Sequence, residues 1–301
     1  MALAPGAVPR AALVGLMLCV LAAAGCGTPS TVADGRVQVV TSTDVWGSVV
    51  AAVGGRDVDV AAIIHNPNQD PHDYQSTPLD AAKIAAAQLT VYNGDGYDDF
   101  FSADLRATPS AKRATIVAFD LSGQPASANE HIFYDLPTVT KVADAVAARL
   151  GRIQPAHAAA FTSNARTFDA HVDALLATAR QIGVRHPGRR VVVTEPVTDY
   201  LLHAAGVTDA TPAEFERAVE SDTDVPVAAL SATLNLITGH QVAAVVDNAQ
   251  TQTTVTDQLT GEARSAGVPV VDVTETLPQG VTGYLQWMTA QVNALSAALA
   301  N

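Results

Sequence analysis

The 301-residue sequence contains only two cysteines, Cys19 and Cys26, and both lie at its N-terminal end. The chain beyond Cys26 therefore has no thiol that could form a disulfide, bind a metal ion or act as a nucleophile. Basic residues are also scarce, with 17 Lys and Arg against 30 Asp and Glu. Because nucleic-acid binding needs clustered positive charge, this balance argues against such a partner and is compatible with the attraction of cations.

The sequence also lacks the short motifs of common hydrolases. Neither H-E-x-x-H nor G-x-S-x-G occurs in it, so a helix-borne zinc hydrolase site and a serine nucleophile elbow are both unsupported. We therefore predict that the protein is not an enzyme. Two alternatives remain. A metal-dependent hydrolase with ligands at strand ends would need an open coordination position for water. A surface adhesin or organic-ligand binder would need an aromatic or hydrogen-bonding cleft.

Long apolar runs are missing except at the N-terminus. An apolar stretch over residues 11–24 follows one basic residue, Arg10, and residues 1–25 are predicted to be a signal peptide. No later apolar run reaches the ~18 residues of a membrane helix. The Ala-Ala-Gly before Cys26 resembles the lipobox of bacterial lipoproteins, which implies lipidation of Cys26 and a location on the outer face of the cell membrane. Simple cleavage of the signal is the alternative. Residues 26–35 are predicted to be a flexible tether.

Short β-branched runs alternate with helical segments along the rest of the chain. The predicted strands are residues 37–43, 57–64, 89–93 and 114–119 in the first half, and 189–195, 241–248 and 269–274 in the second. The predicted helices are residues 45–53, 78–87, 99–106, 197–205, 226–238, 252–265 and 282–299, and a further helix is expected to start near Thr138. Near-continuous apolar strands separated by helices are typical of parallel sheets covered on both faces. The sequence therefore predicts an α/β protein with two parallel-sheet lobes, residues 36–154 and 183–301.

A single long helix is predicted between the lobes, over residues 155–182. Phe161, Phe168 and Val172 recur at helical spacing, and Pro155 suits the first turn. The two lobes should therefore be joined by one rigid helix rather than by several crossing strands.

Side chains that can bind metal ions follow the predicted strands at their carboxyl ends. His72 follows the second strand, His131 the fourth, Glu195 the first strand of the second lobe, and Glu275 the last strand. Ligands of open α/β sheets bind at this edge. A loop histidine taken alone is more often an exposed bystander, but two imidazoles with two carboxylates suit a divalent first-row metal ion. We therefore predict that these four residues bind one metal ion.

The sequence around His72 resembles a motif of the cluster A-I solute-binding proteins of bacterial ABC transporters. The family motif D-P-H-x-Y-x-x-T-P stands here as residues 70–78. The second family motif, D-P-H-x-W-x-D-P, survives only in part at residues 129–137. His131, an aromatic residue and Asp135 keep their register there, whereas the preceding Asp-Pro is lost.

The other two ligand positions of the family are matched less closely. The third is an acid or histidine after a strand, with an aromatic residue five positions on, which Glu195 and Tyr200 fit. The fourth is an acid near the last strand, which Glu275 in its Thr-Glu-Thr context resembles, with Asp272 as a rival. His65 lies in the same loop as the first motif and is a further candidate for a ligand or lid residue.

The resemblance covers the chain after the tether and has consequences for fold and function. It implies two α/β lobes bridged by one rigid helix, with the metal ion in the cleft between them. It also implies an extracytoplasmic monomer that hands Zn²⁺ or Mn²⁺ to a membrane permease and a cytoplasmic ATPase. The His- and Asp-rich loop of many zinc-binding members is missing, which removes one argument for zinc without establishing manganese, and iron also stays open.

The remaining charged and aromatic segments have simpler interpretations. The acidic segments 97–100 and 219–224 are interpreted as solvated loop charges. Four aromatic residues are predicted to belong to the core or the cleft wall: Trp46, Tyr74, Phe133 and Trp287. Because imidazoles must lose their protons to bind a metal ion, the affinity is expected to fall between about pH 6.5 and 5.

Overall fold

The computed structural model describes residues 35–221 and 223–300, and the chain from Gly35 onward forms one compact unit. The predicted signal peptide and Cys26 lie outside the described residues, so the lipidation of Cys26 stays a prediction. Among the helices of the described residues, none is both long and apolar enough to cross a membrane.

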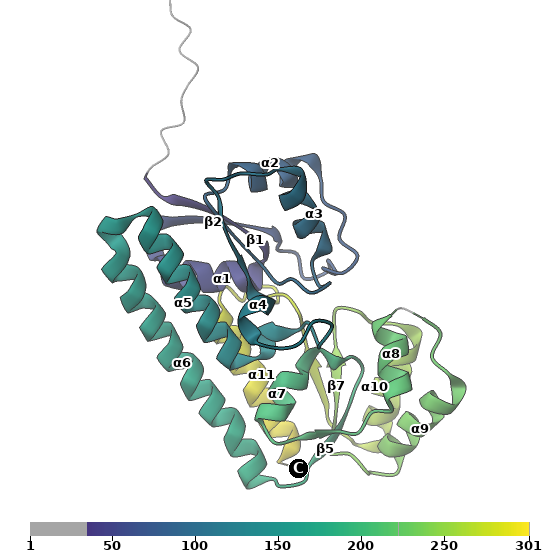
Figure 1. Ribbon diagram of the computed structural model, residues 1–301. Helices are drawn as coiled ribbons and strands as arrows, with labels where there is room; N and C mark the ends of the chain where they lie inside the picture. The colour runs from purple at the N-terminus through teal and green to yellow at the C-terminus, as the bar shows by residue number, and fades with distance from the viewer. Residues whose placement is uncertain (1–34, 222, 301) are drawn as a thin grey trace, which may run out of the picture. The chain divides into compact units, whose positions relative to one another are not determined.

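The first lobe is built on a four-stranded parallel sheet (Figure 1). Its strands are β1 (Val37–Thr43), β2 (Val58–Ile64), β3 (Leu89–Tyr92) and β4 (Ala114–Val117), in the spatial order β2-β1-β3-β4. Successive side chains of a strand point to opposite faces, so Val39 packs in the main core while Val40 packs in a smaller one. All pairings are parallel, and the carboxyl ends of the strands therefore meet at one edge.

Helices cover both faces of this sheet. They are α1 (Asp44–Gly54), α2 (Pro78–Ala86), α3 (Asp99–Ala107), α4 (Ala118–Ser122) and α5 (Leu136–Ile153). Ile84 of α2 and Phe101 of α3 pack with Val40 on one face. Residues of α1 and α5, such as Val49 and Val142, belong to the main core on the other. This three-layer arrangement explains why the strands are apolar on both sides.

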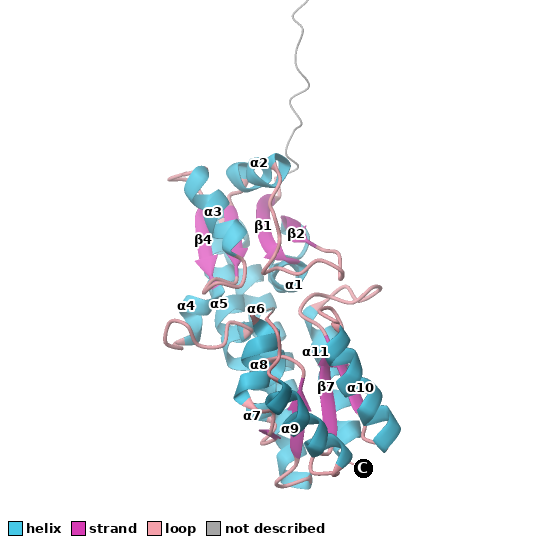
Figure 2. Ribbon diagram, turned by 90° about the vertical axis from the view of Figure 1, so that its right-hand side faces the viewer, coloured by secondary structure: helices cyan, strands magenta, loops and turns pink. Residues whose placement is uncertain are grey.

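The second lobe repeats the scheme with another parallel sheet (Figure 2). Its strands are β5 (Arg190–Val193), β6 (Thr208–Asp209), β7 (Ala244–Asn248) and β8 (Val270–Val273), in the order β6-β5-β7-β8. Its helices are α7 (Asp199–Ala204), α8 (Ala213–Glu220), α9 (Val227–Thr238), α10 (Thr254–Ala266) and α11 (Tyr284–Leu299). Phe215, Ile237 and Leu259 from α8, α9 and α10 pack together on one face, and α7 and α11 contribute to the main core on the other.

One long helix, α6 (Ala158–Arg185), packs along both lobes (Figure 1). It contacts α1 and α5 of the first lobe and α7 and α11 of the second. Phe161, Phe168 and Val172 are buried, as their spacing predicts. The helix begins three residues later than the predicted segment 155–182, because residues 155–157 form a separate 3₁₀ turn. Other 3₁₀ turns are Gly55–Asp57, Ile132–Tyr134 and Pro196–Thr198.

The predicted α/β fold with two parallel-sheet lobes and a long helix is confirmed. Trp46, Phe133 and Trp287 are buried, in line with the core assignment. Three elements were not predicted, namely α4, β6 and α8, and the first two residues of α4 had been assigned to the fourth strand. A two-residue strand has no periodicity to detect, and α8 has only eight residues, of which Phe215 and Ala218 are buried.

Candidate metal-binding site

His72 lies in the loop between β2 and α2, and the polar residues of its motif anchor that loop. The backbone N–H of His72 donates to Oδ1 of Asp70 at 2.8 Å. Thr77 caps α2 reciprocally with Asp80, since the side chain of each accepts from the backbone N–H of the other. The hydroxyl of Tyr74 donates to the same Asp80 carboxylate at 3.0 Å. The imidazole is left to line a cavity at the carboxyl edge of the first sheet.

His131 lies in the loop before α5, and Asn129 holds its ring. Oδ1 of Asn129 lies 2.9 Å from the backbone nitrogen and 3.0 Å from Nδ1 of His131. Nδ2 of Asn129 donates to the carbonyl oxygen of Pro196 at 2.6 Å and to Oδ2 of Asp199 at 3.3 Å, which fixes the orientation of the amide. Because an amide oxygen only accepts, Nδ1 carries the proton in the neutral ring and Nε2 keeps a free lone pair.

Glu275 follows β8, and Gln250 holds its backbone. Oε1 of Gln250 accepts from the N–H groups of Glu275 at 2.6 Å and Thr276 at 3.0 Å. Nε2 of Gln250 donates to the hydroxyl of Thr276 and to the carbonyl oxygen of Pro67, which lies in the loop of His72. One amide side chain therefore connects the loops after β7 and β8 to the first lobe.

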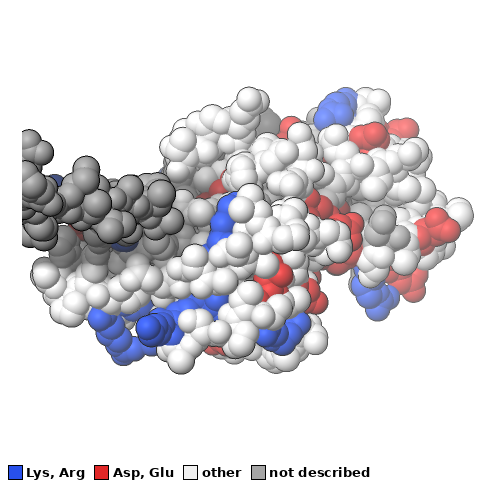
Figure 3. All heavy atoms as spheres, turned by 90° about the horizontal axis from the view of Figure 1, so that it is seen from above, with Lys and Arg blue, Asp and Glu red and all other residues white. Residues whose placement is uncertain are grey.

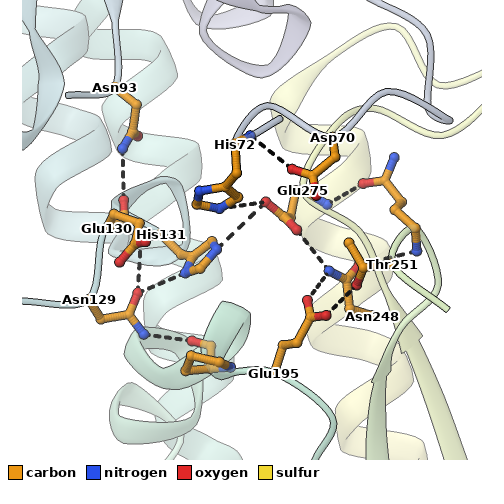
Figure 4. Close-up of polar contacts among 12 residues, drawn as sticks. Asp70, His72, Asn93, Asn129, Glu130, His131, Glu195, Asn248, Thr251 and Glu275 are labelled. Atoms are coloured by element: carbon orange, nitrogen blue, oxygen red, sulfur yellow. Dashed lines mark hydrogen bonds and ion pairs between the residues drawn. The ribbon is translucent and has the colours of Figure 1, made fainter. Parts of the chain in front are cut away.

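Glu195 follows β5 and is linked to Glu275 through Asn248 (Figure 4). Nδ2 of Asn248 donates to Oε2 of Glu195 at 2.5 Å and to Oε1 of Glu275 at 2.7 Å. The hydroxyl of Thr251 donates to the other oxygen of Glu195. Both oxygens of Glu195 are therefore hydrogen-bonded, whereas Oε2 of Glu275 has no hydrogen-bond partner among the described residues.

Three of the predicted side chains converge on one point (Figure 4). Oε2 of Glu275 lies 3.6 Å from Nε2 of His131 and 4.0 Å from Nε2 of His72. The side chains of His131 and Glu275 are only 1% and 3% exposed. All three, together with Glu195, line a cavity of about 380 Å³. A buried carboxylate oxygen without a hydrogen bond is costly, and a cation between it and the two imidazoles would remove that cost.

The wall of this cavity is acidic. It includes Asp70, Asp73, Glu195, Glu220 and Glu275, and the described residues that line it include no Lys or Arg. From above, acidic side chains gather near the middle of the face in view, while basic side chains lie mostly towards its edges (Figure 3). A cleft lined by one sign of charge concentrates counter-ions, here cations.

The two rival candidates from the sequence lie elsewhere. Asp272 is exposed on β8 and does not line the cavity. Its backbone lies opposite that of Asp247 in the neighbouring strand β7. His65 lines a separate cavity of about 450 Å³ together with Asp44. Its Nδ1 lies 3.1 Å from the carbonyl oxygen of Ile63. The structure therefore favours Glu275 as the acid after the last strand and places His65 outside the site.

Glu220, at the end of α8, is a site residue that the sequence interpretation missed. Glu220 is exposed, as the interpretation of segment 219–224 as solvated charges expects, but it also lines the cavity. One ligand atom each from Glu220, His72 and His131 lie within 4.8 Å of one another. No signal could have found it, since an isolated glutamate in an unpredicted helix matches no motif.

The close approach of these groups shifts their pKa values. Burial alone would lower the pKa of His131, but the negative charge of Glu275, whose Oε2 lies 3.6 Å from Nε2, raises it to about 9. Burial acts to raise the pKa of Glu275, yet His131 and His72 lower it overall. Burial raises the pKa values of Glu195 and Glu220 to about 7. The expected window of pH 6.5 to 5, which assumes an ordinary imidazole, is therefore too low for His131.

The sequence matches a known protein family over most of its length. The model of the family described as zinc-uptake complex component A, periplasmic (ZnuA), matches residues 39–298. The chain belongs to this family. Family membership confirms the resemblance to cluster A-I solute-binding proteins that the motif at residues 70–78 indicates.

Individual ZnuA-family relatives differ in the metal that their names give. The chain is 27% identical over 194 residues to the manganese-binding lipoprotein MntA of Bacillus subtilis, a match that covers 60% of this chain and 63% of MntA. It is 29% identical over 174 residues to the iron-binding protein YfeA of Yersinia pestis, covering 55% of this chain and 56% of YfeA. The chain thus spans less than two thirds of the length of these curated relatives.

A solved structure shows the same fold. The periplasmic zinc-binding protein TroA from Treponema pallidum superposes with a TM-score of 0.75 at 19% identity. The superposition covers 89% of this chain and all of that one. The two lobes and the long helix are therefore an arrangement that a known metal-binding protein shares.

Proposed function

We propose that the protein captures a divalent transition metal ion, Zn²⁺ or Mn²⁺, outside the cytoplasm and delivers it to an ABC importer. The observation that carries this proposal is the convergence of two imidazole nitrogens, from His72 and His131, on a buried carboxylate oxygen of Glu275 that accepts no hydrogen bond from a described residue. Glu195 completes the proposed set of ligands, supported by its place at the same edge and its link to Glu275 through Asn248.

The distribution of these ligands suits a carrier. His72 and His131 come from the first lobe, and Glu195 and Glu275 come from the second. A metal ion held by all four would connect the lobes, so the loaded and empty forms would present different surfaces to a permease. Family membership supports a cognate permease and ATPase as partners.

The attachment of the protein to the membrane is part of the same proposal. We infer a lipid anchor at Cys26 and a monomeric carrier on the outer side of the membrane, in keeping with the names of relatives such as the lipoprotein MntA. Replacing Cys26 by Ala should release the protein from the membrane fraction, and mass spectrometry of the mature N-terminus should detect the lipid on the unaltered protein. An unmodified Cys26 on a soluble product would show simple cleavage instead.

Two opposing tendencies determine which metal ion the proposed ligands prefer. Carboxylate oxygens suit manganese, whereas at equal supply the usual order of affinities favours zinc over manganese. The relatives' names include manganese, iron and zinc. The metal must therefore be determined on this protein.

The acidic wall of the cavity also helps to distinguish metal capture from the two alternative functions, an adhesin or organic-ligand binder and a metal-dependent hydrolase. A cavity with five acids and no Lys or Arg among its described residues is poorly suited to an organic ligand, which favours a bound cation over the adhesin alternative. The hydrolase alternative predicts turnover of ester or amide substrates by the metal-loaded protein. An assay that detects such turnover, abolished by the replacement of His72, would favour the enzyme.

Direct metal measurements test the proposal. Elemental analysis of the purified protein, followed by competitive titration with Zn²⁺ and Mn²⁺, should show one tightly bound ion. Changing His72 to Ala should weaken binding by about tenfold or more, since a donor to the ion is lost. His203→Ala is the matched control, because His203 is exposed on α7. Equal affinities of the two variants would contradict the assignment.

A further inference from the structure

We propose that Glu220 is an additional ligand of the captured ion and that its carboxylate favours Mn²⁺ over Zn²⁺. This inference rests on the proposed function and assigns a role within the same site. Glu220 belongs to neither of the two quoted family motifs, and it follows no predicted strand.

The position of Glu220 is the first support. It is the last residue of α8, and its carboxylate lines the same cavity as His72, His131 and Glu275. One of its oxygens and a ring nitrogen of each histidine lie within 4.8 Å of one another. Ligand atoms of a tetrahedral zinc site lie about 3.3 Å apart when the metal–ligand bonds are about 2.0 Å. Only a modest contraction would therefore bring Glu220 into contact with an ion placed between the imidazoles.

The second support is the oxygen of Glu275 that accepts no hydrogen bond within the described part of the chain. Its side chain is 3% exposed and Oε2 faces both histidines without a hydrogen bond from any described residue. This atom marks where the ion would lie. Glu220 likewise makes no side-chain hydrogen bond or ion pair with another described residue, whereas both oxygens of Glu195 accept hydrogen bonds. Glu220 is therefore freer than Glu195 to turn towards an ion.

Several negative charges also lie near Glu220. The C-terminal end of a helix carries partial negative charge, so a carboxylate at the end of α8 is repelled by the helix itself. The same cavity holds the carboxylates of Glu195 and Glu275. A bound divalent ion would reverse the sign of these interactions, because each acid would then face a nearby positive charge.

The number of donors gives the preference among metals. With Glu220, the proposed ligands are two imidazoles and three carboxylates, which exceeds the four ligands of a typical closed zinc site. Manganese prefers a higher coordination number and a larger share of oxygen donors. Removing the Glu220 carboxylate should therefore cost more affinity for Mn²⁺ than for Zn²⁺.

The test compares two variants of the same helix. Glu220→Gln keeps the size of the side chain and removes its charge, while Glu214→Gln makes the same change at an exposed position in the first turn of α8. Affinities for Zn²⁺ and for Mn²⁺ are measured by competition with a chelator at pH 8. The electron paramagnetic resonance spectrum of the Mn²⁺-loaded protein reports the surroundings of the ion. The melting temperature of the metal-free protein reports folding.

We expect Glu220→Gln to weaken Mn²⁺ binding by about tenfold or more, to weaken Zn²⁺ binding less, and to change the Mn²⁺ spectrum. The metal-free melting temperature should stay equal or rise, since repulsion is removed, and Glu214→Gln should match the unaltered protein throughout. Wild-type affinity and an unchanged spectrum in Glu220→Gln would overturn the inference and leave the proposed function intact. Equal losses for both metals would overturn the preference for Mn²⁺. If the unaltered protein binds neither ion, the proposed function itself fails.

Discussion

The amide oxygen of Asn129 lies 3.0 Å from Nδ1 of His131 and 2.9 Å from the backbone nitrogen of the same residue. The other end of that amide donates to Pro196, the residue after Glu195, in the second lobe. A single side chain thus orients one proposed ligand and contacts the backbone next to another (Figure 4). Asn129 occupies the first position of the second motif, where the family has Asp.

Replacing Asn129 should weaken metal binding without removing a ligand. In Asn129→Ala the ring of His131 loses its acceptor, and we expect the affinity to fall about 10- to 100-fold, as for other residues that orient a metal-binding histidine. Asn129→Asp keeps an acceptor for Nδ1 and should lose less. Competitive titration measures both variants.

The control for these variants is Asn235→Asp, on the exposed side of α9. It should bind metal as the unaltered protein does. If Asn129→Ala binds as tightly as this control, the ring of His131 does not depend on Asn129.

Glu275 and Asp272 should differ clearly when each acid is neutralised. Glu275→Gln removes the negative charge that faces both histidines and replaces one carboxylate oxygen by an NH₂ group, and we expect an affinity loss of about tenfold or more, since a charged donor disappears. Asp272→Asn changes an exposed side chain outside the cavity and should have little effect. Isothermal titration with the preferred metal compares the two. A larger loss in Asp272→Asn would reverse the assignment of the acid after the last strand.

Metal binding should release protons, and the affinity should fall as the pH falls. The pKa of His131 is raised to about 9, so its ring is protonated in the metal-free protein at neutral pH and must lose that proton to bind the ion. Each pH unit below 9 should cost about a factor of ten in affinity from this group. Glu195, with a pKa of about 7, should steepen the loss below neutrality.

Calorimetry in two buffers of different ionisation enthalpy counts the released protons. We expect about one at pH 8. The raised pKa of His131 depends on Glu275, so Glu275→Gln should release fewer protons at that pH. Binding without proton release between pH 7 and 8 would show that His131 is not a ligand or is already neutral.

Gln250 should control how fast the ion leaves. Its side chain donates to Pro67 of the first lobe and accepts from the backbone of Glu275, so it holds the His72 loop against the loop after β8. Gln250→Ala removes several hydrogen bonds that contribute about 1 kcal/mol each, and we expect metal dissociation to accelerate about tenfold or more. Stopped-flow mixing with a chelator measures this rate.

Gln241→Ala, at an exposed position before β7, is the matched control for Gln250→Ala. Its dissociation rate should equal that of the unaltered protein. The same rate in both variants would mean that other contacts hold the two loops together.

Much of the fold could be predicted because its strands are short apolar runs separated by helices of regular spacing. The strands with four or more residues were recognised, since burial on both faces requires that composition. The short elements α4, β6 and α8 were missed, because a few residues contain too little periodicity to identify an element. The missed helix α8 carries Glu220, so one error in the fold became one omission in the site.

The sequence by itself determined that His72, Glu195 and Glu275 lie in loops that follow parallel strands. His131 follows the fourth strand only after the short helix α4. Only the tertiary structure decided which of these four residues meet, and which amides hold them. Asn248 lies 53 positions from Glu195 and 27 from Glu275, yet one nitrogen donates to both. Hydrogen bonds and metal coordination act over about 2 to 3 Å, whereas a sequence records only order along the chain. The packing of the two lobes against α6 brings residues that are far apart in the sequence within this distance.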